Sequence, residues 1–133
     1  MATLQEITAK TRSLLSDLLG TFDNGRPAFW AEFTPSPKGK SGLQVVFDAQ
    51  PITRSVIQET QATVRLEEFT FSLTQRDTSS QGMQQLSIAV DRLKAKFPLI
   101  EIRAVPPKDG YLPRINCSIP TWQSTAIALD FVA

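Results

Sequence analysis

The sequence predicts an α+β fold, with a mostly antiparallel sheet of about five to six strands and two helices packed on one face. We expect the order α-β-β-β-α-β-β-β. Residues 69–74 alternate apolar and polar residues, which is typical of a half-buried strand. A polar turn follows, and the apolar residues then recur at helical spacing as Leu86, Val90, Leu93 and Phe97. Alternating segments on both sides of this unit supply the other strands.

Length and composition are those of one globular domain, which we expect to span residues 1–133. The chain is 41% hydrophobic and 20% charged, and its net charge is +1, so global charge demands neither a polyanionic nor a membrane partner. No apolar run approaches the roughly 20 residues that span a bilayer. Charged residues near the N-terminus argue against a signal peptide.

The chemistry available to this chain is limited. It has no histidine and a single cysteine, Cys117, which excludes Ser-His-Asp and Cys-His machinery, Cys-x-x-Cys sites and an internal disulfide. Cys117 falls on the apolar side of a predicted strand, so we expect an inert buried thiol. Neighbouring Glu67 and Glu68 would point to opposite faces of a strand and would not form an acid–base pair. We therefore expect a protein that is not an enzyme and needs no cofactor or metal.

The first element predicted is a helix over residues 4–19. Thr3 and Glu6 have the spacing of a capping box, and leucines then recur at helical spacing. Gly20 fits a C-terminal cap in the left-handed conformation. The leucine face is expected to pack on the sheet.

Asn24-Gly25 predicts a turn, and residues 28–33 alternate as a strand. Trp30 lies opposite Phe29 and Phe33 in this alternation. We therefore expect the second face of the strand to be covered by a helix or by another subunit.

Residues 34–42 form a loop rich in proline, glycine and lysine. Gly39-Lys40-Ser41 is not a phosphate-binding loop, because Thr34 stands where that motif needs its first glycine and a strand follows instead of a helix. A solvated basic loop is the simpler interpretation. The alternative is that Lys38 and Lys40 contact a phosphate backbone or an acidic partner.

The pattern of residues 43–49 predicts the next strand. Residues 52–62 are expected to form either a long hairpin arm or a loop. Val64 and Leu66 have the opposite parity from Phe69, Phe71 and Leu73. A β-bulge near Glu67-Glu68 would produce such a phase change.

Pro98 ends the second helix, and residues 100–104 alternate as a strand. A proline-rich loop, residues 105–113, leads to a strand over residues 115–119, which Pro120 ends or marks as an edge. Residues 121–123 are expected to turn the chain into a final strand carrying Ile127, Leu129 and Phe131.

This order of elements resembles the tail terminator (tail completion) proteins of long-tailed bacteriophages and their relatives in the phage neck. The resemblance covers most of the chain, through pattern and size. The stretches that carry it are the helix ending in the turn Phe22–Pro27, the long-armed hairpin, the strand Phe69–Leu73 leading into the helix that ends at Phe97-Pro98, and the Gly110-Tyr111 loop before the strand Ile115–Pro120.

The resemblance implies a structural role. Such proteins form a homo-oligomeric ring, commonly a hexamer, that caps the tail tube and joins it to the neck and head-connector proteins. DNA passes through the lumen without sequence-specific binding. The place implied is the virion tail or neck, after synthesis in the host cytoplasm, without a membrane partner.

Subunit and partner contacts are placed by loop length and composition, on the arm, the sheet edges, the two loops and the two tryptophans. The candidate residues are Trp30, Lys38, Lys40, Ile52, Arg54, Val56, Ile57, Lys108, Tyr111 and Trp122. Two alternatives stay open. One is another virion assembly protein, such as a baseplate or tube adaptor. The other is a small-ligand-binding α+β domain. The only residues that favour it are Glu68, Arg76 and Asp77 near a turn.

Overall fold

The computed structural model describes residues 3–32, 34–48, 52–57, 63–105, 112–124 and 129–132. Two helices and a mostly antiparallel set of strands confirm the α+β fold class. Lys108, Tyr111, Ile127 and Ala49 lie outside the described residues. Among the residues that are described, no helix is both long and apolar enough to cross a membrane.

The main sheet has seven strands among the described residues, and its central path runs β2-β4-β6-β8-β7. The bounds are β2 Phe29–Trp30, β4 Leu43–Phe47, β6 Thr63–Gln75, β8 Arg114–Ser124 and β7 Glu101–Ala104. All pairings along this path are antiparallel except β2 with β4, which is parallel. The predicted strand over residues 28–33 is therefore reduced to two residues at the edge of the sheet.

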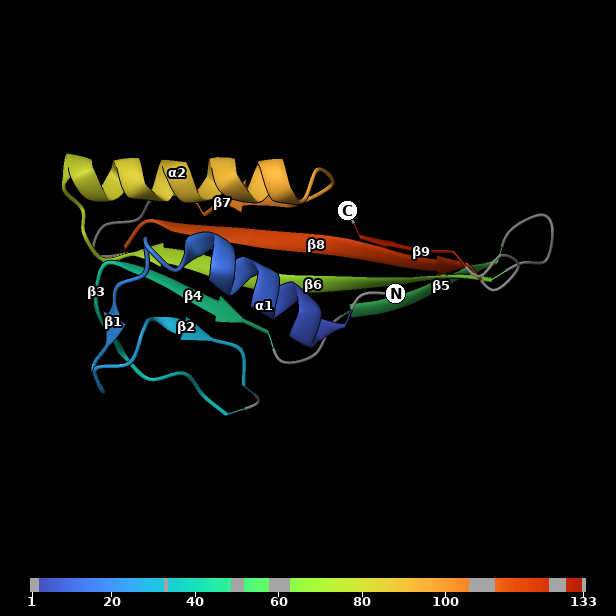
Figure 1. Cartoon of the computed structure of the whole chain (residues 1–133), viewed down its shortest axis with the longest axis horizontal. Helices are drawn as coiled ribbons and strands as arrows, with labels where there is room; N and C mark the ends of the chain where they lie inside the picture. Colours follow the sequence, from blue (N-terminus) through green and yellow to red (C-terminus); the bar gives the residue numbers. More distant parts are fainter. Residues whose placement is uncertain are drawn as a thin grey trace.

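β6 and β8 are long enough to serve two parts of the sheet. One half of each lies beside β4 or β7, and the other half pairs with β5 (Ile52–Ile57) or β9 (Leu129–Val132). We call the four-stranded part β5-β6-β8-β9 the distal sheet and the remainder the body. In Figure 1 β5 and β9 lie beyond the ends of both helices along the long axis of the molecule. Of the two interpretations of residues 52–62, the hairpin arm is thus confirmed for residues 52–57, and residues 58–62 lie outside the described residues.

The predicted bulge at Glu67-Glu68 is wrong. β6 pairs with β8 in unbroken register from Val64 with Ser124 to Thr74 with Arg114, and with β5 from Thr63 to Glu68. The phase change in the apolar pattern is therefore not caused by an extra residue in β6.

The prediction that residues 121–123 turn the chain is also wrong, because β8 continues to Ser124. Of the two interpretations of Pro120, a strand end and an edge, the strand end is therefore wrong. On the side away from β6, β7 pairs with residues 115–118 and β9 with residues 121–124. Pro120 falls in the gap between these partners, where a missing N–H interrupts neither ladder.

The first helix, α1, spans Leu4–Leu15 instead of residues 4–19. Its start is as predicted, because the Thr3 hydroxyl accepts a hydrogen bond from the Glu6 N–H at 3.2 Å. Buried Thr11 donates its hydroxyl to the Ile7 carbonyl at 2.8 Å, which allows a polar residue on the buried face.

Gly20 is not a left-handed helix cap, since positive φ angles occur only at Gly25 and Gly42 among the described glycines. It lies against the next chain segment, where a Cβ atom would meet the Ser41 carbonyl oxygen. Its N–H donates to the Leu43 carbonyl at 2.9 Å. Close backbone approach is therefore what requires glycine here. It is also next to a two-stranded sheet of β1 (Thr21–Phe22) and β3 (Gly39–Ser41), the latter within the predicted loop.

The second helix, α2, spans Ser80–Lys96 and starts at the N-cap Ser79. Buried Gln75 fastens the preceding strand to this helix, because its amide donates to the Gly82 carbonyl and its side-chain oxygen accepts from the Asp77 N–H, both at 3.0 Å. Asp17, just after α1, forms a bidentate ion pair with Arg92 of α2 at 2.6 and 3.1 Å.

The core lies between the two helices and one face of the body. Every second residue of β4, and of β6 from Phe69 to Gln75, is buried there, with Phe47 stacked on Phe71 at 4.5 Å between ring centroids. The helices contribute the predicted stripe. The buried core residues of the two helices are Ile7, Leu15, Leu86, Ala89 and Leu93, with Phe97 directly after α2.

Candidate functional site

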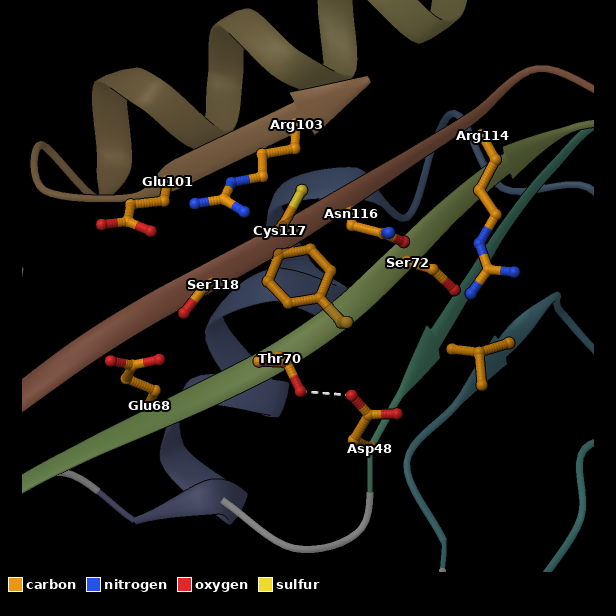
Figure 2. A pocket seen from close by; sticks show the side chains of 12 residues that line it. Asp48, Glu68, Thr70, Ser72, Glu101, Arg103, Arg114, Asn116, Cys117 and Ser118 are labelled. Atoms are coloured by element: carbon orange, nitrogen blue, oxygen red, sulfur yellow. Dashed lines mark hydrogen bonds between the residues drawn. The ribbon is translucent and has the colours of Figure 1, made fainter. Parts of the chain in front are cut away.

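The face of the body that carries no helix is the main surface available for function. Because side chains alternate along a strand, the residues between the buried ones project from this face. They come from β4, from β6 and from the two strands that follow α2, and most are polar. The residues that line this face are Val46, Asp48, Glu68, Thr70, Ser72, Glu101, Arg103, Arg114, Asn116 and Ser118. They surround an open hollow of about 810 Å³ (Figure 2).

Strand register arranges these residues in rows across the sheet. One row joins Asp48, Thr70, Ser118 and Glu101, with the Asp48 N–H donating to the Thr70 carbonyl at 2.9 Å. The Thr70 hydroxyl also donates to the Asp48 carboxylate, as Figure 2 shows. This row therefore has hydroxyl groups at its centre and a carboxylate at each end.

The next row contains Val46, Ser72, Asn116 and Arg103, and beyond it Thr74 pairs with Arg114. Charge is consequently separated along the strand direction. Carboxylates occupy one end of the face and guanidinium groups the other. Such a face can donate and accept many hydrogen bonds.

No group of three or more His, Cys, Asp or Glu residues in the described part of the chain is placed to hold a metal ion. Cys117 lies behind this face and is 3% exposed. Burial raises the pKa of its thiol to about 12, so it stays protonated at neutral pH. The expectation of an inert buried thiol is confirmed.

Trp30 has partners within its own chain. Its ring meets Phe22 edge to face at 6.0 Å between centroids, and its indole N–H donates to the Thr34 carbonyl at 2.8 Å. The guanidinium group of Arg26 lies 5.9 Å from the ring centre. The ring remains half-buried, so part of it is still accessible.

Lys38 and Lys40 are both exposed. Their segment is not a free loop, because β3 pairs with β1 and the Lys38 carbonyl accepts from the Asp23 N–H at 2.8 Å. The two lysines are thus presented by a fixed backbone at the end of the body.

The other candidates that the structure describes belong to the distal sheet. Ile52, Arg54, Val56 and Ile57 are all in β5, and Trp122 is in β8, opposite Leu66 on one side and Phe131 on the other. The structure therefore gathers five of the ten candidates into one part of the sheet, away from Trp30, Lys38 and Lys40.

The three charged residues that favoured a small-ligand site, Glu68, Arg76 and Asp77, do not lie together. Glu68 lies within β6, whereas Arg76 and Asp77 follow the strand. The Asp77 carboxylate accepts a hydrogen bond from the Ser79 N–H at 3.0 Å, and hydrogen bonding to Ser79 holds its pKa below the usual value. Asp77 thus serves the turn into α2.

A smaller hollow of about 280 Å³ lies between α1 and β2 and is lined in part by Arg12, Arg26 and Phe29. The Arg12 guanidinium group lies 4.8 Å from the centre of the Phe29 ring. Attraction between the cation and the ring face holds this group in place. Arg12 also lies in the last turn of α1, where a cation is favoured by the helix dipole.

Sequence reasoning missed the open face as a unit. The alternation predicted that Thr70, Ser72 and Thr74 face outward, and the same signal was present around Arg103 and Asn116. The alternation does not show which strands are neighbours in the sheet, so the rows of residues across the sheet could not be predicted.

Comparisons with known proteins assign this chain to no family. No protein-family model matches the sequence, and a search of curated proteins also finds no match. Function is therefore argued from the residues and their geometry.

Proposed function

We propose that this chain is a structural subunit of a bacteriophage tail, a terminator or neck protein. In this proposal several copies, commonly six, form a ring that caps the tail tube and joins it to the head. DNA passes through the lumen during packaging or ejection.

The observation that carries the proposal is the distal sheet. It continues the two central strands beyond the helical layer, so part of the sheet is presented away from the body that folds around the core (Figure 1). Extended strands of this kind are suited to contacts between copies, since an edge strand offers unpaired backbone groups.

Each copy in a ring needs two different contact surfaces, because a ring is built from head-to-tail contacts. The distal sheet supplies them, with β5 on one edge and β9 on the other in the part of the chain described. The body supplies fixed attachment points for other proteins, among them exposed Lys38 and Lys40.

A lumen for DNA should be polar without gripping phosphates. The net charge of +1 and the mixture of carboxylates, hydroxyls and guanidinium groups on the open face are compatible with such a role. A strongly basic face would instead retain the nucleic acid.

The deciding experiment is to add the purified chain to tail tubes that lack a terminator and to examine them by electron microscopy, with light scattering of the free chain across concentrations. We expect rings at tube ends only, with a central opening wide enough for a DNA duplex. Attachment along the tube wall or at the baseplate end would favour a tube or baseplate adaptor instead. A chain that stays monomeric at all concentrations and does not bind tubes would contradict the proposal.

A paired variant tests the attachment points. Lys38→Glu with Lys40→Glu should weaken binding to tubes and leave self-association unchanged, because both lysines lie outside the distal sheet. Lys10→Glu, an exposed substitution on α1, is the matched control and should leave both unchanged.

A second candidate, a small-ligand-binding domain, is favoured only by the open hollow on the body. Ligand pockets are usually enclosed and largely apolar, whereas this one is open and mostly polar. Thermal stabilisation by a polar metabolite, abolished by Arg114→Ala, would support this candidate.

A further inference from the structure

We propose that the hollow between α1 and β2 is a binding site for an organic carboxylate, that is, a carboxylate group carried on a small apolar body. The hollow has a volume of about 280 Å³ and shares no lining residue with the open face. The inference goes beyond the terminator role and does not depend on it.

Two cations line this hollow. Arg12 comes from the last turn of α1, and Arg26 comes from the segment between β1 and β2. Among the described residues, no carboxylate forms an ion pair with either of them. Asp17, which follows α1, is already bound by Arg92. The hollow therefore presents two guanidinium groups whose charge is not neutralised by a carboxylate of the described chain.

Both guanidinium groups are held in place by aromatic rings. The group of Arg12 lies 4.8 Å from the centre of the Phe29 ring, and that of Arg26 lies 5.9 Å from the centre of the Trp30 ring. A ring face attracts the cation but leaves the N–H donors at the edge of the guanidinium plane free for another partner. An anion can therefore be bound with little further loss of side-chain freedom.

The backbone beside β2 is fixed as well. The Arg26 N–H donates to the side-chain oxygen of Asn24 at 3.0 Å, and the Arg26 carbonyl accepts from the Phe22 N–H at 2.9 Å. Phe29 is a core residue and is 6% exposed. The hollow is therefore formed before any ligand arrives, as is usual for ligand sites.

The other lining residues set the class of anion. Leu19, Pro27 and Phe29 supply apolar walls, and Ser16 adds a hydroxyl group at the end of α1. An apolar cavity of about 150 Å³ can hold a benzene ring. About 280 Å³ thus leaves room for a ring with a carboxylate group. The guanidinium fork matches the two carboxylate oxygens, whereas a phosphate ion would leave the apolar walls without a partner.

The end of α1 opposes an anion, because the last carbonyls of a helix place negative charge there. Two of these carbonyls already have donors. The Leu14 carbonyl accepts from Arg92 at 3.1 Å, and the Leu15 carbonyl accepts from the Leu18 N–H at 2.9 Å. Two full positive charges exceed the roughly half charge of a helix end. The balance in the hollow therefore favours an anion.

Titration calorimetry with sodium benzoate tests the site. Benzoate should bind once per chain, and inorganic phosphate should not compete with it. Benzyl alcohol has the same ring without the carboxylate group and should bind about tenfold more weakly or worse. Arg12→Gln and Arg26→Gln should each weaken benzoate binding by about tenfold or more, because each removes a charged hydrogen-bond donor.

Lys10→Gln is the matched control. It removes one positive charge from the same helix, but Lys10 is exposed and does not line the hollow, so benzoate binding should not change. Arg12→Lys keeps the charge and loses the planar fork, so its affinity should fall between those of the wild type and Arg12→Gln. Circular dichroism of all variants checks that they fold.

Failure of benzoate to bind would overturn the inference. So would benzyl alcohol binding as tightly as benzoate, or equal weakening by Lys10→Gln.

The natural carboxylate can belong to a free small acid or to a side chain of a neighbouring protein, since both make the same contacts. Binding to tail tubes in saturating benzoate separates these sources. Loss of tube binding assigns the carboxylate to the tube, and unchanged binding assigns it to an acid from solution. Tube binding without benzoate tests the terminator role alone, so the two proposals can fail separately.

Discussion

The body and the distal sheet are built from the same two long strands but acquire their stability differently. In the body, Phe69, Phe71 and Leu73 are buried under helices that the same chain supplies. In the distal sheet, β5 pairs with β6 and β9 pairs with β8, and neither helix extends over this part of the sheet (Figure 1). The same two long strands therefore serve one part of the sheet that the helices cover and one part that lies beyond them.

The comparison also shows what a phase change in a strand pattern means. A bulge inserts an extra residue into one strand, whereas here the pairing of β6 with β8 is continuous. Both give the same sequence pattern. The choice between them depends on the register of β5 and β8 against β6, which is settled by residues far away in the chain.

The largest effect is expected in the core of the body. Phe71→Ala should lower the free energy of unfolding by about 3–5 kcal/mol, since Phe71 is 2% exposed and stacked on Phe47. Ile88→Ala, at an exposed apolar position on α2, is the control and should cost less than half as much. Denaturant unfolding of both variants gives the two values. Equal losses would show that Phe71 is not a core residue.

A smaller loss of stability is expected from a substitution at the turn between β6 and α2. Gln75→Ala removes both hydrogen bonds of a fully buried side chain and leaves the Gly82 carbonyl and the Asp77 N–H without these partners. The expected loss is about 1–3 kcal/mol in the free energy of unfolding. Gln84→Ala, exposed on α2, is the control and should have almost no effect. A loss at Gln75 no larger than in this control would mean that water replaces both bonds.

The smallest effect concerns the ion pair within the helical layer. The hydrogen bond from Arg92 holds the pKa of Asp17 below its usual value. A lowered folded-state pKa stabilises the fold above the unfolded-state pKa of about 3.9, and this contribution disappears as the pH falls through the lowered value.

Asp17→Asn should therefore lower the melting temperature slightly at pH 7, and by less as the pH falls below about 3.9. Both residues are substantially exposed, so added salt should reduce the difference. Asp91→Asn, on the exposed side of α2, is the control. A difference that persists at low pH would assign the effect to packing.

Local patterns predicted the elements that depend on local physics. Thr3 caps α1 as expected, and Leu86, Leu93 and Phe97 mark the buried stripe of α2 and the residue after it. The end of α1 was wrong because Gly20 serves a close backbone approach to Ser41, which is a tertiary contact.

Pro120 does not end β8, although a strand end was one of its two interpretations. Proline ends a strand only where the missing N–H is needed, and here it falls between two partner strands. Of the candidate interface, β5 could be inferred as an arm from its polar, glycine-free sequence. The continuous pairing of β6 without a bulge could not, since it depends on the register with β5 and β8.

The pairing of β6 with β8 also bears on how the chain folds. The paired positions, from Thr74 with Arg114 to Val64 with Ser124, are joined through the whole of α2 and β7. Contacts between such distant residues are slow to form, because the intervening chain must be ordered first. During synthesis the β5–β6 hairpin can close early, but one edge of β6 must wait for β8 to emerge. That interval exposes a long strand edge, so the yield of soluble protein should depend on temperature and on chaperones more than the stability of the finished fold would indicate.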